Sequence, residues 1–191
     1  MSPHGPPQER LNAVIMGAAF GDGRWCAEWL AQAGVSLLLG DFEAQALSQV
    51  SVALGATGRF CDVASKSSVA IFANEVTKLV GVPDILINAA GSGYLRTLGM
   101  IRMTGALLPA MRRSSTPMLV LSLESERSNP VGLFAYAASQ TGFAGTSKAI
   151  ADTMRGSSIE VVSASRKDAS LVLEEFVSRR AAAASRARQF G

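Results

Sequence analysis

Short, uninterrupted runs of apolar residues alternate with helical patterns along almost the whole chain. Apolar runs of this length, without alternation, are typical of strands buried on both faces. Hydrophobic residues between the runs recur at the spacing of a helix face, as in Val69, Phe72, Val76 and Leu79. The pattern predicts strands at 13–16, 35–39, 59–61, 84–88, 118–121 and 159–163, and helices at about 24–33, 44–54, 66–80, 95–113, 136–154 and 170–186.

The alternation of strands and helices predicts the fold class α/β. Right-handed crossovers between parallel strands would give a doubly wound, mostly parallel, Rossmann-like sheet of about six strands in three layers. The sequence contains no internal repeat and no evident linker. We therefore expect a single domain over residues 11–191, preceded by a flexible, proline-rich tail over residues 1–10.

Composition narrows the possible chemistry. Hydrophobic residues make up 48% of the 191 residues, and no apolar stretch approaches the ~20 residues that span a bilayer, so we expect no membrane association and a cytoplasmic location. The only histidine is His4, in the tail, which argues against a His-based metal site or a catalytic Ser-His-Asp triad. Cys26 and Cys61 lie in apolar surroundings and are expected to be buried free thiols.

Arginines gather near the C-terminus, at Arg179, Arg180, Arg186 and Arg188. No aromatic residue lies among them to stack on bases, so we do not expect nucleic acid as a partner. The simpler interpretation is a solvated helix end, where cations are favoured by the helix dipole.

A glycine-rich turn follows the first predicted strand, with Gly17, Gly21 and Gly23 in a GxxxGxG spacing. Glycines between a strand and a helix permit a tight turn and close approach of the backbone to a pyrophosphate at the helix N-terminus. The position of the turn in the first strand–helix–strand unit favours a dinucleotide site.

Asp41 ends the second predicted strand. A carboxylate at this position can accept hydrogen bonds from adenosine ribose hydroxyls and would repel a 2′-phosphate, which favours NAD over NADP. An alternative role for Asp41 is the N-cap of the next helix.

These motifs, in this order, resemble those of the short-chain dehydrogenase/reductase family. The family combines the glycine turn and acidic residue with an aspartate–valine pair after the third strand and an Asn-(Asn/Ala)-Ala-Gly turn after the fourth. The resemblance covers about residues 11–165. The matching residues here, which the resemblance implies for cofactor binding or its support, are Gly17, Phe20, Gly21, Asp22, Gly23, Asp41, Asp62, Val63, Asn88, Ala89 and Gly91.

Asp22 departs from the family pattern, which has an apolar residue between the second and third glycines. A carboxylate beside a pyrophosphate would repel it, although the same carboxylate could cap the following helix.

The catalytic residues that the resemblance would imply are mostly missing. Tyr136 stands at the position of the family's catalytic tyrosine, but Gln140 replaces the lysine four residues later that lowers the pKa of the tyrosine from about 10. The position of the substrate-orienting serine falls on Leu123, flanked by Ser122 and Ser125, and the family's asparagine has no counterpart between Gly91 and Asn129.

The region that would close over a substrate is also reduced. Ser165-Arg166 replaces the family's Pro-Gly after the sixth strand, and no seventh strand is predicted before Gly191. The segment after the fourth strand is shorter than in the family as well.

We therefore expect an NAD-binding, catalytically impaired family member that acts as a subunit of a homo-oligomer, or of a hetero-oligomer with a catalytically complete homologue. The small residues Ala137, Ala138, Gly142, Gly145 and Ala149 would permit close helix approach across an interface, or alternatively packing on the chain's own sheet. The other function considered is an active NAD(P)-dependent oxidoreductase on a small carbonyl or alcohol, using Tyr136, Gln140 and Ser122 or Ser125.

Overall fold

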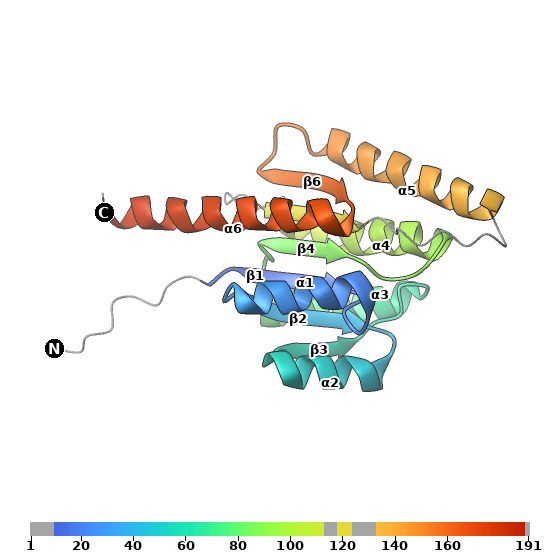
Figure 1. The fold of residues 1–191 in the computed structure, drawn as a ribbon, viewed down its shortest axis with the longest axis horizontal. Helices are drawn as coiled ribbons and strands as arrows, with labels where there is room; N and C mark the ends of the chain where they lie inside the picture. The colour runs from blue at the N-terminus through green and yellow to red at the C-terminus, as the bar shows by residue number, and fades with distance from the viewer. Residues whose placement is uncertain (1–9, 113–117, 124–132, 190–191) are drawn as a thin grey trace.

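The computed structural model describes residues 10–112, 118–123 and 133–189 (Figure 1). Strands and helices alternate through the whole of this part of the chain, as the hydrophobic pattern predicts. In chain order the elements are β1 (Asn12–Met16), α1 (Gly21–Gln32), β2 (Ser36–Asp41), α2 (Ala44–Leu54), β3 (Thr57–Phe60), α3 (Lys66–Leu79), β4 (Ile85–Asn88), α4 (Tyr94–Met111), β5 (Met118–Leu123), α5 (Leu133–Thr153), β6 (Ile159–Ala164) and α6 (Arg166–Gln189).

The six strands form one parallel sheet in the order β3-β2-β1-β4-β5-β6. This confirms the predicted doubly wound α/β fold. The strand order reverses between β1 and β4, and such a switch point leaves a crevice at the carboxyl ends of the strands, where ligands of open α/β sheets bind.

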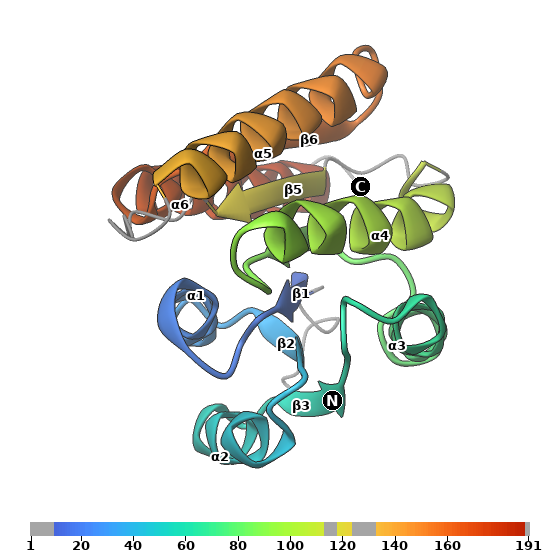
Figure 2. The same cartoon turned by 90° about the vertical axis from the view of Figure 1, so that its right-hand side faces the viewer.

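Helices cover both faces of the sheet (Figure 2). On one face α1, α2 and α6 bury a cluster that includes Leu30, Leu47 and Phe176. On the other face α3 and α4 bury a second cluster around Phe72 and Met103, with α5 beside them. The central strands β1 and β4 are largely apolar because side chains from both of their faces enter these two clusters.

Helix α5 turns its small residues outward. The stripe Ala137, Ala138, Gly142, Gly145 and Ala149 is exposed, and Phe143 on the opposite side is buried. The alternative that these small residues pack on the chain's own sheet is therefore wrong.

Helix α6 begins four residues earlier than predicted, at Arg166, and runs to Gln189. Ser165 explains the earlier start, since its Oγ accepts the backbone N–H of Asp168 at 3.3 Å, as the side chain of an N-cap residue does. The same hydroxyl donates to the carboxylate of Asp168 at 2.8 Å. The second half of the helix extends well beyond the edge of the sheet (Figure 1).

The arginines of α6 are not all solvated. Arg180 pairs with Asp84 at 2.5 Å and its side chain is only 19% exposed, so the expectation of a solvated helix end is wrong for this residue. Arg179 pairs with Glu160 at 2.7 Å but stays 54% exposed, as that expectation has it. The carboxylates of Asp84 and Glu160 lie at the amino ends of β4 and β6, and α6 passes over these ends.

Leu79 also differs from the prediction, which placed it on the buried face of its helix. Its side chain is 55% exposed, whereas Val69, Phe72 and Val76 are buried as the spacing predicts. Helix α3 ends at Leu79, and Val80, in the turn that follows, packs against the core in its place.

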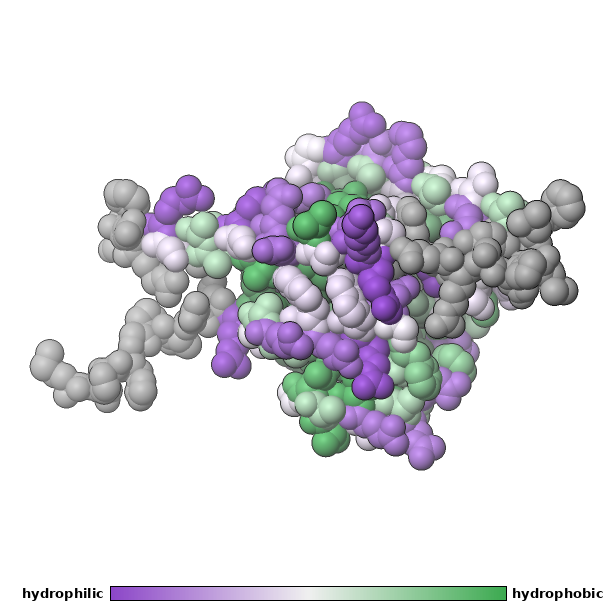
Figure 3. Space-filling model, viewed as in Figure 1, coloured by the Kyte–Doolittle hydropathy of each residue, from purple (hydrophilic) through white to green (hydrophobic). Residues whose placement is uncertain are grey.

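The face formed by α1, α2 and α6 has a mixed surface (Figure 3). Hydrophobic surface gathers over α2, where Val52 is 80% exposed. A strip of hydrophilic surface runs between the amino end of α6 and that of α1.

Candidate functional site

The glycine turn between β1 and α1 is closely packed at its first and last glycines. A Cβ on Gly17, which has a φ of +82°, would lie 2.6 Å from the backbone of Ala89 and Ala90. A Cβ on Gly23 would lie 2.1 Å from the carbonyl oxygen of Gly17. The turn can therefore form only without side chains at these two positions.

The middle glycine faces open space. Gly21 has a φ of +57°, and a Cβ there would meet no atom within 4 Å. Gly21 is the first residue of α1, whose first amide groups have no carbonyl partner within the helix. Open space beside unpaired N–H groups and the positive end of a helix dipole suits an anionic group.

Asp41 holds the turn against the end of β2. Its buried carboxylate accepts the N–H of Ala19 at 2.9 Å through Oδ2 and that of Glu43 at 3.1 Å through Oδ1. The N-cap of α2 is Glu43, so the N-cap alternative for Asp41 is wrong. Each carboxylate oxygen has a second lone pair, which leaves acceptor capacity for hydroxyl groups.

Asp22 does not cap α1. The N-cap is Phe20, which makes no side-chain capping bond, and Asp22 lies inside the first turn. One carboxylate oxygen, Oδ1, accepts Nε of Arg166 at 2.7 Å and lies 2.6 Å from Nη2 of the same side chain. Sequence reasoning missed Arg166, which lies 144 residues away along the chain.

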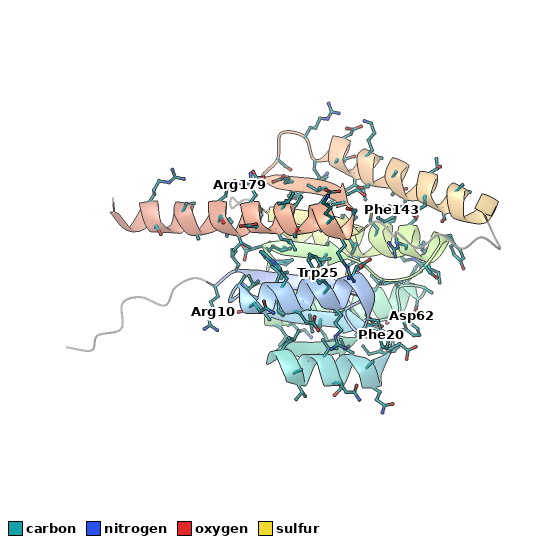
Figure 4. All side chains as sticks on the ribbon, in the orientation of Figure 1. Arg10, Phe20, Trp25, Asp62, Phe143 and Arg179 are labelled. Atoms are coloured by element: carbon teal, nitrogen blue, oxygen red, sulfur yellow. The ribbon has the colours of Figure 1, made fainter. Side chains whose placement is uncertain are left out.

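Asp62 and Val63 follow β3 at the same edge of the sheet, where the labelled Asp62 and Phe20 lie (Figure 4). Asp62 shapes the loop, because its carboxylate accepts the N–H of Ala64 at 2.8 Å. Val63 is buried with its side chain against Gly99 of α4, and its carbonyl accepts Nη1 of Arg102 at 2.7 Å.

The loop after β4 completes this edge. Asn88 is buried, and its Nδ2 donates to Oγ1 of Thr104 at 3.2 Å, a contact that fixes β4 to α4. Ala89 donates its N–H to the carbonyl of Met16 at 2.9 Å and packs against the glycine turn. Gly91 has a φ of +85° and a close approach to Leu95, so it too requires a glycine.

The three predicted catalytic residues lie on β5 and α5. Ser122 is fully buried in β5, in register with Asn88, and its Oγ has no hydrogen-bond partner among the described residues. Tyr136 and Gln140 are one turn apart on α5, and Gln140 is half-buried. The side chain of Tyr136, and Ser125 altogether, lie outside the described residues.

Neither cysteine has the environment of a reactive thiol. Both are buried and free, as the sequence predicts. Burial raises the pKa of Cys26 to about 12 and that of Cys61 to about 11, so both stay protonated at neutral pH.

The described residues lack the features of a metal site and of a membrane span. No three His, Cys, Asp or Glu side chains in this part of the chain come together as a metal-binding group. No helix in it combines the length and apolar composition needed to cross a bilayer.

A hollow of about 280 Å³ lies at the amino end of β6, away from the glycine turn. Its lining includes Glu160, Phe176, Arg179 and Arg180. The charged groups there are engaged in the Arg179–Glu160 and Arg180–Asp84 pairs. The carboxyl edge of the sheet is therefore the better candidate for the functional site.

Known proteins share both the motifs and the fold. Residues 11–98 match the family model described as short chain dehydrogenase. The "Dehydrogenase/reductase SDR family member 7B" of Bos taurus is 33% identical over 157 residues, which cover 66% of this chain and 48% of that protein. The chain thus spans about half the length of this relative.

Two solved structures have the same fold at lower identity. A short chain dehydrogenase/reductase from Burkholderia phymatum in complex with NAD has a TM-score of 0.75 at 23% identity, over 83% of this chain and 66% of its own. A metagenomic short-chain oxidoreductase in complex with NADP has a TM-score of 0.76 at 23% identity, over 87% of this chain and 90% of its own.

The family match covers β1 to the first turn of α4, which is the segment that carries the glycine turn, Asp41, Asp62 and Asn88. The solved structures extend the shared fold over most of the remaining strands and helices. The chain belongs to the short-chain dehydrogenase/reductase family.

Proposed function

We propose that this chain binds NAD at the carboxyl edge of its sheet and does not catalyse hydride transfer by itself. The observation that carries the proposal is the glycine turn, in which Gly17 and Gly23 are closely packed while Gly21 faces open space, with Asp41 bonded to it. The pyrophosphate would lie beside Gly21 and the first turn of α1, and the adenosine ribose would lie beside Asp41. The relatives solved with NAD or NADP support a dinucleotide as the ligand.

The residues around Asp41 favour NAD over NADP. A 2′-phosphate would meet the buried carboxylate of Asp41. Two exposed phenylalanines are close to Asp41 along the chain. Phe42 is the next residue, and Phe20 follows Ala19, whose N–H donates to Asp41. Neither side chain offers a positive charge to a 2′-phosphate.

The catalytic part of the proposal depends on the α5 and β5 residues. NAD supplies a hydride acceptor when bound, but a proton must also move at the substrate oxygen. Gln140 carries no charge that would lower the pKa of Tyr136, and the hydroxyl of Ser122 is fully buried. Tyr136 would then hold its proton at neutral pH.

Calorimetric titration of the purified chain with NAD, NADH and NADP tests the binding. We expect NAD and NADH to bind, and NADP to bind at least about tenfold more weakly. Asp41→Ala should weaken NAD binding and reduce the preference over NADP, whereas Glu43→Ala, which removes the exposed carboxylate two residues later, should change neither. Undetectable binding of all three dinucleotides would overturn the proposal.

NADH absorbance in the presence of a panel of ketones and aldehydes tests the absence of catalysis. We expect no turnover above the rate without protein. Turnover that Tyr136→Phe abolishes would replace this part of the proposal with the active oxidoreductase on a small carbonyl or alcohol.

We also propose that the outward face of α5 makes the chain a subunit of an oligomer, with a second copy or a catalytically complete homologue as its partner. The exposed small residues on α5 support this, since Cβ atoms built on Gly142 and Gly145 meet nothing within 4 Å and another helix could approach closely. Gly145→Arg should lower the mass measured by light scattering, whereas Val52→Arg on exposed α2 should not. A monomeric chain that also fails to bind a homologue would overturn the proposal.

A further inference from the structure

The Asp22–Arg166 pair connects the amino ends of two helices on the same face of the sheet. Asp22 is in the first turn of α1, and Arg166 is the first residue of α6. Helix α1 packs on β1 and β2, and α6 packs on β5 and β6. The pair therefore links the two sides of the boundary between β1 and β4, where the strand order reverses.

Arg166 occupies an electrostatically unfavourable position at the amino end of α6. A cation in the first turn of α6 is opposed by the helix dipole, whereas an acidic residue there would be favoured. Contacts from α1 compensate, since Arg166 bonds to Asp22 and its guanidinium lies 5.7 Å from the ring centroid of Trp25, whose label in Figure 4 lies between α1 and α6. The position of Arg166 is thus determined by the turn at α1.

The guanidinium has capacity beyond this ion pair. It carries five N–H donors, and the contacts with Asp22 use Nε and Nη2. The Arg166 side chain is 45% exposed and lies beside the first turn of α1, to which Asp22 belongs. A planar group with several donors is well suited to phosphate oxygens.

We propose that Arg166 is a cofactor-binding residue that neutralises Asp22 and donates hydrogen bonds to the dinucleotide pyrophosphate. The proposal rests on the proposed NAD binding and identifies how a carboxylate is tolerated at the phosphate site. With Arg166 in place the Asp22 charge is compensated locally. Without Arg166 the same carboxylate faces the pyrophosphate and repels it.

Coupling between the two residues is the distinguishing consequence. Arg166→Ala should weaken binding of NAD and of ADP about tenfold or more, the usual size of a lost charge-assisted contact. The double variant Asp22→Asn/Arg166→Ala should recover much of that loss, because the repelling charge is gone as well. Adenosine, which has no phosphate, should bind the wild type and the variants equally.

Titration calorimetry of wild type, Arg166→Ala, Arg166→Lys, Asp22→Asn and the double variant with NAD, ADP and adenosine tests this. Arg166→Lys, which keeps the charge but loses the planar fork, should lie between wild type and Arg166→Ala. The matched control is Arg179→Ala, which breaks the exposed Arg179–Glu160 pair (2.7 Å) farther along α6, at the opposite end of the strands, and should leave binding unchanged. Melting temperatures establish that each variant is folded.

The outcomes separate the two proposals. If the wild type binds neither NAD nor ADP, the proposed function fails. If the wild type binds and Arg166→Ala binds equally well or more tightly, the proposed function stands and the role of Arg166 is overturned. That role is equally overturned if Asp22→Asn does not reduce the effect of Arg166→Ala.

Discussion

Arg180 of α6 and Asp84, the residue before β4, form an ion pair with Nη2 and Oδ1 2.5 Å apart, although 96 residues separate them. The second carboxylate oxygen of Asp84 accepts the N–H of Asn12, at the start of β1, at 2.9 Å. The two side chains are only 19% and 13% exposed. One carboxylate therefore holds the amino ends of two central strands and the helix that covers them.

Replacement of Asp84 should destabilise the fold. Asp84→Asn leaves the mostly buried Arg180 without a counter-charge, and we expect the free energy of unfolding to fall by about 2 kcal/mol. Glu160→Gln is the control, because its pair with Arg179 is about half exposed and should contribute less than about 1 kcal/mol. Urea unfolding of both variants measures the difference, and equal losses would contradict it.

Gly23→Ala should disrupt the turn. The new Cβ would lie 2.1 Å from the carbonyl oxygen of Gly17, so the backbone has to shift and the space beside Gly21 changes. We expect the free energy of unfolding to fall by at least about 2 kcal/mol and NAD binding to be lost. Gly142→Ala, in an open position of a helix, should instead raise the free energy of unfolding by about 0.5 to 1 kcal/mol and leave NAD binding intact. Calorimetry together with urea unfolding distinguishes these results.

Stability should fall in alkaline solution because of the two buried thiols. Burial raises the folded-state pKa of Cys26 to about 12 and that of Cys61 to about 11, above the value of 9.0 for an unperturbed thiol. Below pH 9 both states hold these protons and the thiols add no pH dependence. Between pH 9 and the folded pKa values only the unfolded chain releases them, so the free energy of unfolding decreases as pH rises.

The loss at pH 10.5, relative to pH 8, should be about 2 kcal/mol for each thiol. Urea unfolding at the two pH values measures it. The double variant Cys26→Ala/Cys61→Ala should lack this part of the pH dependence, whatever its stability at pH 8. An unchanged pH dependence in the double variant would show that other groups are responsible.

Catalysis should require more than a single restored residue. Gln140→Lys places an ammonium one turn from Tyr136, but Leu123 still stands where the family has its serine. We expect Gln140→Lys alone to show no NADH turnover with simple ketones, and Leu123→Ser/Gln140→Lys to show a rate at least about tenfold above background. Addition of Tyr136→Phe to the double variant should abolish that rate. Turnover by Gln140→Lys alone would show that the lysine was the only missing element.

The predicted strands agree with the structure wherever a strand is buried on both faces. The stretches 85–87 and 118–121, inside the predicted strands, have no polar positions on either face, and the sheet has β4 and β5 within about two residues of the predicted bounds. β3 is less well predicted because it is an edge strand. It comprises Thr57–Phe60, with no buried residue, and so leaves no continuous apolar run.

The predicted cofactor residues mostly come together because parallel strands bring their carboxyl ends to one edge. That rule places Gly17, Asp41, Asp62 and Asn88 near one another without knowledge of side-chain contacts. It does not predict which side chains pair across the edge. Arg166 was missed because β6, the strand before it, is separated from β1 by β4 and β5, and a charge pair between helix ends leaves no local sequence pattern.

Helix α6 has a further consequence for how the molecule fluctuates. At 1.5 Å per residue its 24 residues span about 36 Å, and Val177 is the last of its described hydrophobic residues in the core cluster. The second half of the helix extends beyond the edge of the sheet (Figure 1), and its run of alanines at 181–184 has high helix propensity. Amide hydrogens should therefore exchange with deuterium progressively faster from Arg180 toward Gln189, so that the end of α6 frays while the domain beneath its first half stays closed.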